Sequence, residues 1–174
     1  RAIAGVAVVL DTDVNAAALA EAAAAGDAIA SLAYVTVGTG IGVGLVVDGR
    51  PVHGLGHPEA GHMLPRRHLA HEGFAGVCPF HGDCLEGLAS GTAIRAAWGS
   101  ASSFPAEHPF WEAEAWYLAQ LCASLFLTVS PARIVLGGGV MNQQRLFAPI
   151  RRRTVDILGG YLPLISDETI DALI

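Results

Sequence analysis

The stretch Tyr34-Val-Thr-Val-Gly-Thr-Gly-Ile-Gly-Val-Gly44, continued by Leu45-Val46-Val47, decides the fold of this chain. Its β-branched residues lie before and among the glycines, which predicts two strands joined by a tight Gly-rich turn. The pair Asp48-Gly49 predicts a second turn directly afterwards, so the stretch indicates successive hairpins. The glycines do not form the dinucleotide fingerprint Gly-x-Gly-x-x-Gly, because Val43 stands where the third glycine is required.

Apolar runs and capping residues on either side of this stretch predict further strands and helices. Strands are expected at residues 3–10, 34–47 and 133–136, and helices at residues 16–25, 89–98, 111–129 and 140–158. This order of elements is typical of an α/β protein. A weak boundary between subdomains is expected around residues 26–32.

The composition excludes several classes of function. The chain has 174 residues, enough for one domain of ordinary size or for pieces of two. Sixteen acidic residues stand against ten basic ones, all arginine, which argues against a nucleic-acid partner or a polybasic membrane anchor. Without lysine, a Walker-type phosphate loop cannot be formed. The sequence shows neither a long apolar span nor a signal-peptide pattern, so a cytoplasmic location is expected.

A group of cysteines and histidines has the spacing of metal ligands. Cys78-x2-His81-x2-Cys84 offers three ligands from one short turn, and His62 offers a fourth, a set that suits tetrahedral zinc. Three other histidines compete with His62 for the fourth position: His57, His68 and His71. A bound metal would order residues 52–85, which otherwise form a structureless loop of about thirty residues. The alternative is that two buried cysteines and several surface histidines occur here by chance.

Two glycine-rich turns could bind phosphate. In residues 38–44 the missing side chains let backbone N–H groups and the Thr39 hydroxyl approach an anion, although a simple tight turn would use the same residues. Gly137-Gly138-Gly139 lies between an expected strand and an expected helix, whose N-terminus would attract a phosphate group.

Three carboxylates are candidates for site chemistry. Asp13 follows an apolar run at the edge of the sheet where α/β proteins bind ligands, and it could accept a proton from a hydroxyl group. The alternative is that Asp11 or Asp13 only caps a helix. Glu59 and Glu86 lie close in sequence to the metal motif, so a metal would fix both, and paired carboxylates suit sugar hydroxyls. The alternative for them is ordinary solvated surface glutamate.

Five segments together follow the order of motifs of one known family: Asp11-Thr-Asp-Val-Asn-Ala-Ala-Ala-Leu-Ala-Glu21, Thr36-Val-Gly-Thr-Gly-Ile-Gly-Val-Gly44, His57-Pro-Glu-Ala-Gly-His62, Cys78-Pro-Phe-His-Gly-Asp-Cys-Leu-Glu-Gly-Leu-Ala-Ser-Gly91 and Leu136-Gly-Gly-Gly-Val-Met141. The chain resembles the ROK family (repressors, open reading frames and sugar kinases). The family's common metal segment is Cys-x-Cys-Gly-x-x-Gly-Cys, and the histidine-containing variant seen here is similar to the fructokinase branch.

The resemblance implies an α/β protein with the actin-like ATPase (ribonuclease H-like) fold, of which this chain would be mostly the second lobe of a two-lobe sugar kinase. Residues 1–30 would be the end of the N-terminal lobe, with the catalytic aspartate, and residues 31–174 the C-terminal lobe. The implied reaction is ATP-dependent phosphorylation of fructose to fructose 6-phosphate. The implied partners are ATP with Mg²⁺, a hexose, a structural Zn²⁺ and a second copy of the chain in a homodimer.

The resemblance also implies a role for each matching residue. Asp13 would be the catalytic base. The sugar hydroxyls would be contacted by Asn15, Glu59, His62 and Glu86. ATP would be bound by Gly38, Thr39 and Gly40 at the phosphates and by Gly137, Gly138 and Gly139 on the adenosine side. The metal would be held by His62, Cys78, His81 and Cys84, with one ring nitrogen of His62 for the metal and the other for the sugar.

Two other readings remain open at this point. A glucokinase or mannokinase of the same family would differ only in the sugar. A sugar-sensing transcriptional repressor would add a DNA-binding segment, but Asp13 together with the Gly-rich hairpin favours the enzyme. The family's first phosphate loop, Asp-x-Gly-Gly-Thr-Lys, does not occur in these residues, and both ends lie within apolar runs. We therefore expect a fragment of a longer chain, which alone lacks normal kinase activity.

Overall fold

The computed structural model describes residues 2–3, 5–7, 10–26, 29–100 and 104–174. Its α-helices are α1 (Asp13–Ala25), α2 (Leu85–Ala89), α3 (Gly91–Ala97), α4 (Phe110–Thr128), α5 (Phe147–Leu158) and α6 (Ile170–Leu173). Its strands are β1 (Ala2–Ile3), β2 (Val6–Ala7), β3 (Leu32–Val37), β4 (Ile41–Val47), β5 (Arg50–Pro51) and β6 (Arg133–Gly137). Short 3₁₀ helices are η2 (Ala60–His62), η3 (Leu69–His71), η5 (Val140–Asn142) and η6 (Gln144–Leu146).

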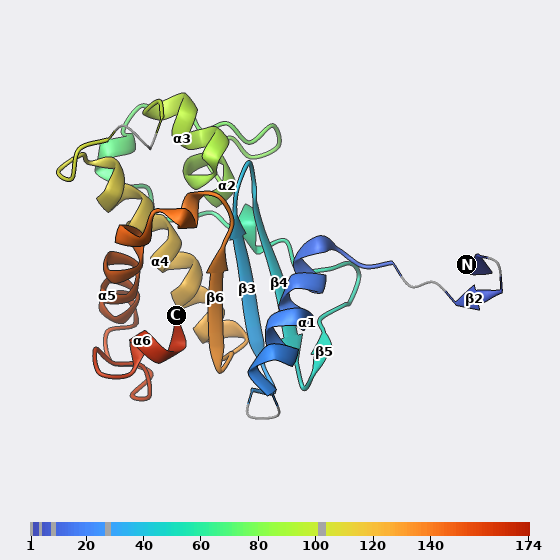
Figure 1. The fold of residues 1–174 in the computed structure, drawn as a ribbon. Coiled ribbons are helices and arrows are strands. Elements are labelled where there is room, and N and C mark those ends of the chain that lie inside the picture. Colours follow the sequence, from blue (N-terminus) through green and yellow to red (C-terminus); the bar gives the residue numbers. More distant parts are fainter. Residues whose placement is uncertain (1, 4, 8–9, 27–28, 101–103) are drawn as a thin grey trace.

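A mixed sheet with the strand order β5-β4-β3-β6 forms the centre of the molecule (Figure 1). β3 and β4 are antiparallel and pair as far as Val37 and Ile41, while β6 runs parallel to β3. Asp48 and Gly49 both adopt positive φ angles, 51° and 71°, as a tight hairpin turn between β4 and β5 requires. The predicted hairpins and the α/β class are therefore confirmed.

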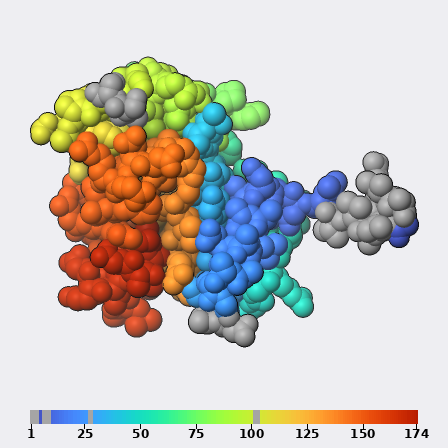
Figure 2. Space-filling view, viewed as in Figure 1, coloured from blue at the N-terminus to red at the C-terminus, as the bar shows by residue number. Residues whose placement is uncertain are grey.

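Residues of β3 alternate between the two faces of the sheet. Ala33, Val35 and Val37 belong to the main hydrophobic core, which also contains the buried side of α4. Leu32 packs with Ala18 of α1 in a smaller cluster on the other face. Figure 2 shows α1, in blue, covering the sheet on this side, with the C-terminal elements in orange and red beside it. The sheet is thus covered by helices on both faces.

Helix α1 lies directly on the backbone of β4 because two glycines leave room for it. A Cβ atom at Gly44 would lie 2.1 Å from the carbonyl oxygen of Val14, and one at Gly42 would lie 2.8 Å from the Val14 side chain. The helix is capped at its start by Thr12, whose side chain accepts a hydrogen bond from the backbone N–H of Asn15, and it ends at Gly26. The expected helix at residues 16–25 is confirmed and begins three residues earlier.

The predicted strand over residues 3–10 is wrong for the part of it that the structure describes. The short strands β1 and β2 pair with each other in an antiparallel hairpin, and residues 4, 8 and 9 lie outside the described residues. Neither strand belongs to the four-stranded sheet. An apolar run forms a long strand only beside a partner, and here the chain folds back on itself at Gly5.

The predicted helix over residues 140–158 is also wrong in its first third. The 3₁₀ turns η5 and η6 precede α5, which begins only at Phe147. Pro149 explains the late start, because its ring would clash with the carbonyl group four residues earlier in a continuous helix and is tolerated only in a first turn. The predicted helices over residues 89–98 and 111–129 are confirmed with small shifts as α3 and α4, and the short helix α2 precedes α3, mostly in residues for which no helix was predicted.

The predicted division of the chain near residue 30 into parts of two lobes stays a prediction. In the ranges that the structure describes, no helix has both the length and the apolar character needed to cross a membrane.

We expect Gly44→Ala to lower the free energy of unfolding by about 1–3 kcal/mol, the usual cost of adding a methyl group to a packed interior. The new Cβ atom would meet the rigid backbone of α1 at Val14. Gly54→Ala is the matched control, since nothing lies within 4 Å of a Cβ atom there. Urea denaturation followed by circular dichroism measures both; equal stability of the two variants would contradict the packing described above.

Candidate functional site

Asp13 is held at the start of α1, where the chain turns from an extended segment into the helix. Thr12 is the N-cap, so the alternative interpretation of Asp11 or Asp13 as the cap is wrong. The Asp13 carboxylate accepts a hydrogen bond from the backbone N–H of Val14 at 3.0 Å and is otherwise exposed. A helix N-terminus favours a negative charge, which suits an ionised carboxylate at this position.

A cavity of 390 Å³ brings several of the predicted site residues together. Its walls come from the start of α1, the tip of the β3–β4 hairpin, the segment before η2 and the first turn of α2. The predicted site residues among them are Asp13, Gly38, Thr39, Gly40, Glu59 and Glu86. Two carboxylates from separate segments thus share one cavity with the glycine turn and with Asp13.

The hairpin tip is fastened to the helices behind it. The backbone N–H of Gly91 donates to the Gly38 carbonyl at 2.6 Å, and the Thr92 hydroxyl donates to the Thr39 carbonyl at 2.8 Å. The Glu86 carboxylate accepts a hydrogen bond from the Ile41 N–H at 3.0 Å. A Cβ atom at Gly40 would lie 2.6 Å from the same carboxylate oxygen, so the glycine is required for this contact.

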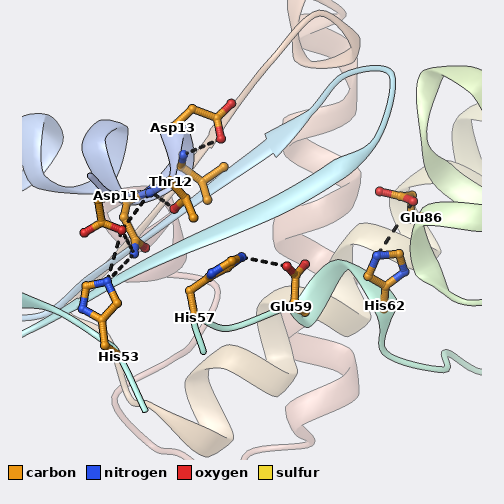
Figure 3. Close-up of polar contacts among 10 residues, drawn as sticks. Asp11, Thr12, Asp13, His53, His57, Glu59, His62 and Glu86 are labelled. Carbon is orange, nitrogen blue, oxygen red and sulfur yellow. Dashed lines mark hydrogen bonds and ion pairs between the residues drawn. The ribbon is translucent and has the colours of Figure 1, made fainter. Parts of the chain in front are cut away.

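Glu59 and His62 flank a glycine that packs against the hairpin. A Cβ atom at Gly61 would lie 1.9 Å from the carbonyl oxygen of Ile41, so η2 can sit on β4 only with glycine there. The Glu59 carboxylate accepts a hydrogen bond from His57 Nε2 at 2.7 Å, and both side chains line the cavity. Figure 3 shows this pair between Asp13 and His62.

The predicted metal ligands form one compact group. One ligand atom from each of His62, Cys78, His81 and Cys84 can be chosen so that all lie within 4.8 Å of one another. Nδ1 of His62 lies 3.7 Å from the Cys78 sulfur and 3.5 Å from the Cys84 sulfur. Two ligands of a tetrahedral zinc ion, one sulfur and one nitrogen, are about 3.6 Å apart at the usual bond lengths. The donor set and spacing therefore fit a thiolate-binding metal such as zinc.

The two thiols of this group have different surroundings. The backbone N–H of His81 is the main cause that lowers the pKa of the Cys78 thiol to about 7. Burial raises the pKa of Cys84. A bound cation would favour the thiolate form of both residues, which is the form that ligates a metal.

The histidines that competed for the fourth ligand position lie outside the group. Nε2 of His57 is bonded to Glu59, and the His68 side chain caps η3. His71 is buried, with Nδ1 at 3.1 Å from the Tyr117 hydroxyl, and burial lowers its pKa to about 4. The ring of His71 is therefore neutral at pH 7.

His62 faces the metal group with one nitrogen and Glu86 with the other, although His62, a predicted sugar contact, does not itself line the first cavity. Its Nδ1 points to the two sulfur atoms, while its Nε2 lies 4.0 Å from a carboxylate oxygen of Glu86 (Figure 3). This arrangement is compatible with the predicted double use of the ring.

A second cavity of 370 Å³ lies on the other side of the hairpin tip. Gly38 and Thr39 line both cavities, and Gly139 lines only the second. Gly137 and Gly138 do not line it; a Cβ atom would lie 2.5 Å from the Tyr34 hydroxyl at Gly137 and 2.6 Å from the Val37 carbonyl oxygen at Gly138. Close packing therefore accounts for these two glycines.

Asn15, a predicted sugar contact, does not line the first cavity. It is fully buried, and its side-chain amide donates to Asp11 Oδ1 at 2.8 Å. The same oxygen lies 3.1 Å from His53 Nε2. The sequence reasoning missed His53 and the non-capping role of Asp11, because nothing in the spacing of the two residues indicates that they meet.

Sequence reasoning considered His57 only as a metal ligand, and it did not place His57, Arg95 or Gln143 at a cavity. His57 lines the first, and Arg95 and Gln143 line the second. The position of His57 directly before Pro58-Glu59 was an available signal, whereas Arg95 and Gln143 come from segments whose approach depends on the tertiary fold.

Comparisons with known proteins agree with this fold. A model of the ROK family matches residues 2–170. A fructokinase from Zymomonas mobilis is 49% identical over 161 residues, which cover 90% of this chain and 54% of that protein. A fructokinase from Lactococcus lactis is 39% identical over 122 residues, which cover 70% of this chain and 42% of that protein. The chain spans about half the length of the curated relatives it matches.

Solved structures give the same result. The ROK hexokinase from Thermus thermophilus superposes with a TM-score of 0.67 and 29% identity, covering 86% of this chain and 55% of that one. A ROK family glucokinase from Streptomyces griseus superposes with a TM-score of 0.60 at 23% identity, covering 87% of this chain and 60% of that one. The predicted actin-like ATPase fold is thereby confirmed.

We expect the Asp11 carboxylate to titrate below its ordinary range, because the Asn15 amide above all, and then the Thr12 N–H, stabilise its ionised form. Since the folded-state pKa is below the unfolded one, the stability that this group contributes is present at neutral pH and is lost as the pH falls through the folded-state value. Asn15→Ala should raise the pKa of Asp11 toward normal.

Carbon-detected NMR titration of the Asp11 carboxyl group measures this change, with Asn142→Ala, an exposed amide on η5, as the control. An unchanged Asp11 titration in Asn15→Ala would disprove the proposed cause.

Proposed function

Because the chain belongs to the ROK family, we propose that the protein transfers the γ-phosphoryl group of ATP to a hexose, and that the hexose is fructose. The observation that carries the proposal is the 390 Å³ cavity, which joins Asp13, the glycine turn and two carboxylates. These are the parts that phosphoryl transfer to a sugar needs: a base, a phosphate cradle and hydroxyl acceptors.

Asp13 is the proposed base. It lies at the wall of the cavity on the first turn of α1, where the helix is fixed to β4 by close backbone packing. In the reaction, Asp13 accepts the proton of the attacking sugar hydroxyl while the hydroxyl oxygen bonds to the γ-phosphorus. At the same time the bond between the γ-phosphorus and the ADP oxygen breaks. A fixed position matters because correct placement of the reacting groups supplies much of the rate.

The hairpin tip is the proposed phosphate contact. Gly38 and Thr39 line both cavities, so a nucleotide whose adenosine lies beside Gly139 can extend its phosphates across the tip toward Asp13. The lack of side chains at the glycines lets the phosphates approach the backbone closely. Of the three glycines predicted on the adenosine side, only Gly139 is then proposed to contact the adenosine directly. Gly137 and Gly138 have a packing role.

The proposed sugar contacts are Glu59, Glu86 and His62. Ionised carboxylates accept hydrogen bonds from neighbouring hydroxyls, and Nε2 of His62 lies on the same side as Glu86. Asn15 is proposed to act through Asp11, since it is buried and bonded there. Fructose is supported by relatives named fructokinase at 39% to 49% identity, and glucose or mannose remain outcomes of the test.

A zinc ion is the proposed occupant of the His62, Cys78, His81 and Cys84 group. With four protein ligands the coordination is complete, so the ion would be structural and would fix the segment that carries Glu59 and Glu86. Mg²⁺ is the proposed companion of ATP and would neutralise part of the phosphate charge. The predicted homodimer stays a prediction.

Asp13→Asn should lower kcat for sugar-dependent ADP formation by about 10²–10⁴-fold, since it removes the base with little change in shape. A coupled assay of the full-length protein with ATP, Mg²⁺ and each of fructose, glucose and mannose measures this. Asp48→Asn, in the exposed β4–β5 turn, is the control. Full turnover by Asp13→Asn would remove Asp13 from the mechanism, and sugar binding without turnover by the parent would favour a sugar sensor.

Cys84→Ala should abolish zinc binding and raise the KM for the sugar. It should also lower the Tm by roughly 10 °C, which corresponds to a loss of about 3–4 kcal/mol of unfolding free energy in a chain of this size. Cys122→Ala is a matched control, because both cysteines are fully buried and Cys122 lies outside the group. Metal analysis by mass spectrometry, thermal unfolding and kinetics measure the three effects. Equal zinc content in the two variants would refute the assignment.

A further inference from the structure

Three hydrogen-bond donors surround the Oδ1 oxygen of Asp11. It accepts hydrogen bonds from the backbone N–H of Thr12 at 2.8 Å and from the Asn15 amide at 2.8 Å, and His53 Nε2 lies 3.1 Å away. Thr12 and Asn15 belong to the start of α1, whereas His53 belongs to the segment after β5. A single carboxylate oxygen therefore joins two separate parts of the chain (Figure 3).

The hydrogen-bonding chemistry of Asp11 determines that Nε2 of the His53 ring carries a hydrogen. A carboxylate only accepts hydrogen bonds, so Nε2 of His53 must carry the hydrogen that faces Asp11. That nitrogen then has no lone pair for the Asn15 amide, which lies 3.4 Å from it and bonds to Asp11 instead. Both donors thus converge on the same acceptor.

Asn15 makes the α1 side of this junction rigid. Its side chain is fully buried, and its backbone N–H donates to the Thr12 hydroxyl at 3.1 Å. Asp13 lies between these bonded residues, so the junction holds the turn that presents the proposed base.

The His53 side leads directly to the proposed sugar contacts. A tight turn follows, in which the N–H of Gly54 donates to the Gly56 carbonyl at 2.8 Å, and next comes His57, which donates to Glu59. Asp11, His53 and His57 line one cavity of 340 Å³, which shares Thr12 and His57 with the cavity that contains Asp13. Fixing His53 therefore fixes one end of the segment that carries Glu59.

We propose that Asp11 and His53 are a pair of positioning residues, which hold the Asp13 turn and the Glu59 segment at the distance that phosphoryl transfer requires. This inference rests on the proposed kinase function. The His53 side chain is 51% exposed and that of Asp11 23%, and a contact so open to solvent contributes little to global stability even when the histidine is charged. The contact therefore serves the geometry of the site and contributes little to the stability of the fold.

A double-mutant cycle on the full-length protein tests the pair. Asp11→Ala and His53→Ala should each lower kcat/KM for the sugar by about 10–100-fold, the effect of a small misplacement of reacting groups, and should leave the KM for ATP unchanged. The double variant should be no worse than the weaker of the two single variants, because the two residues act through one contact. His53→Gln and Asp11→Asn, which keep a donor and an acceptor oxygen, should restore most of the activity.

Asp171→Ala is the control, since it removes the carboxylate of another exposed ion pair, with Arg151 at 3.3 Å, between α5 and α6. It should change neither kcat/KM nor the KM for ATP. Thermal unfolding of each variant separates loss of folded protein from loss of positioning.

The pairing would be overturned if the losses of Asp11→Ala and His53→Ala multiply in the double variant. It would also be overturned if activity falls only in proportion to the folded fraction. Neither outcome would contradict the proposed kinase function. A parent protein with no sugar phosphorylation would overturn the proposed function first. The same cycle measured on fructose affinity by calorimetry would then decide whether the pair positions a binding site, and absence of fructose binding by the parent would refute both proposals.

Discussion

Contact between backbones without intervening side chains is the constraint on which this site depends. Gly44 lets the carbonyl group of Val14, at the start of α1, lie against β4 on one side. Gly61 lets η2 lie against the carbonyl group of Ile41 in the same strand. Consequently the turn with Asp13 and the segment with Glu59 are both fixed to one strand. A central strand of a sheet is among the most rigid supports a protein offers, so the first turn of α1 and the irregular segment with Glu59 acquire defined positions.

Glu86 and His62 extend this rigidity from the hairpin to the metal group. One oxygen of Glu86 accepts the Ile41 N–H, and the other lies 4.0 Å from Nε2 of His62. The opposite nitrogen of His62 faces the thiols of Cys78 and Cys84. The glycine turn, the Glu86 carboxylate, His62 and the cysteines thus form a continuous series of contacts.

The sequence permitted prediction of those parts of the fold and site that depend on local spacing. The β3–β4 hairpin follows from its glycines, and the metal group from its ligand spacing. The late start of α5 follows from Pro149 but is hidden by the apolar pattern around it. The contact between Asp11 and His53 could not be predicted, because it joins residues 42 positions apart whose approach is set by the way α1 packs on β4. Likewise, only the packed structure separates Gly139, which lines a cavity, from Gly138, which lies on Val37.

The glycine packing also decides which positions are open to redesign. A larger residue at Gly61 of η2 would collide with the backbone of Ile41, and one at Gly40 would displace the Glu86 side chain, whereas a Cβ atom at Gly38 would meet nothing within 4 Å. Pro58 lines the first cavity between His57 and Glu59, whose side chains are bonded to each other. Substitutions meant to reshape this cavity are therefore better tolerated at Pro58 than at Gly61, where any side chain would push η2 away from β4.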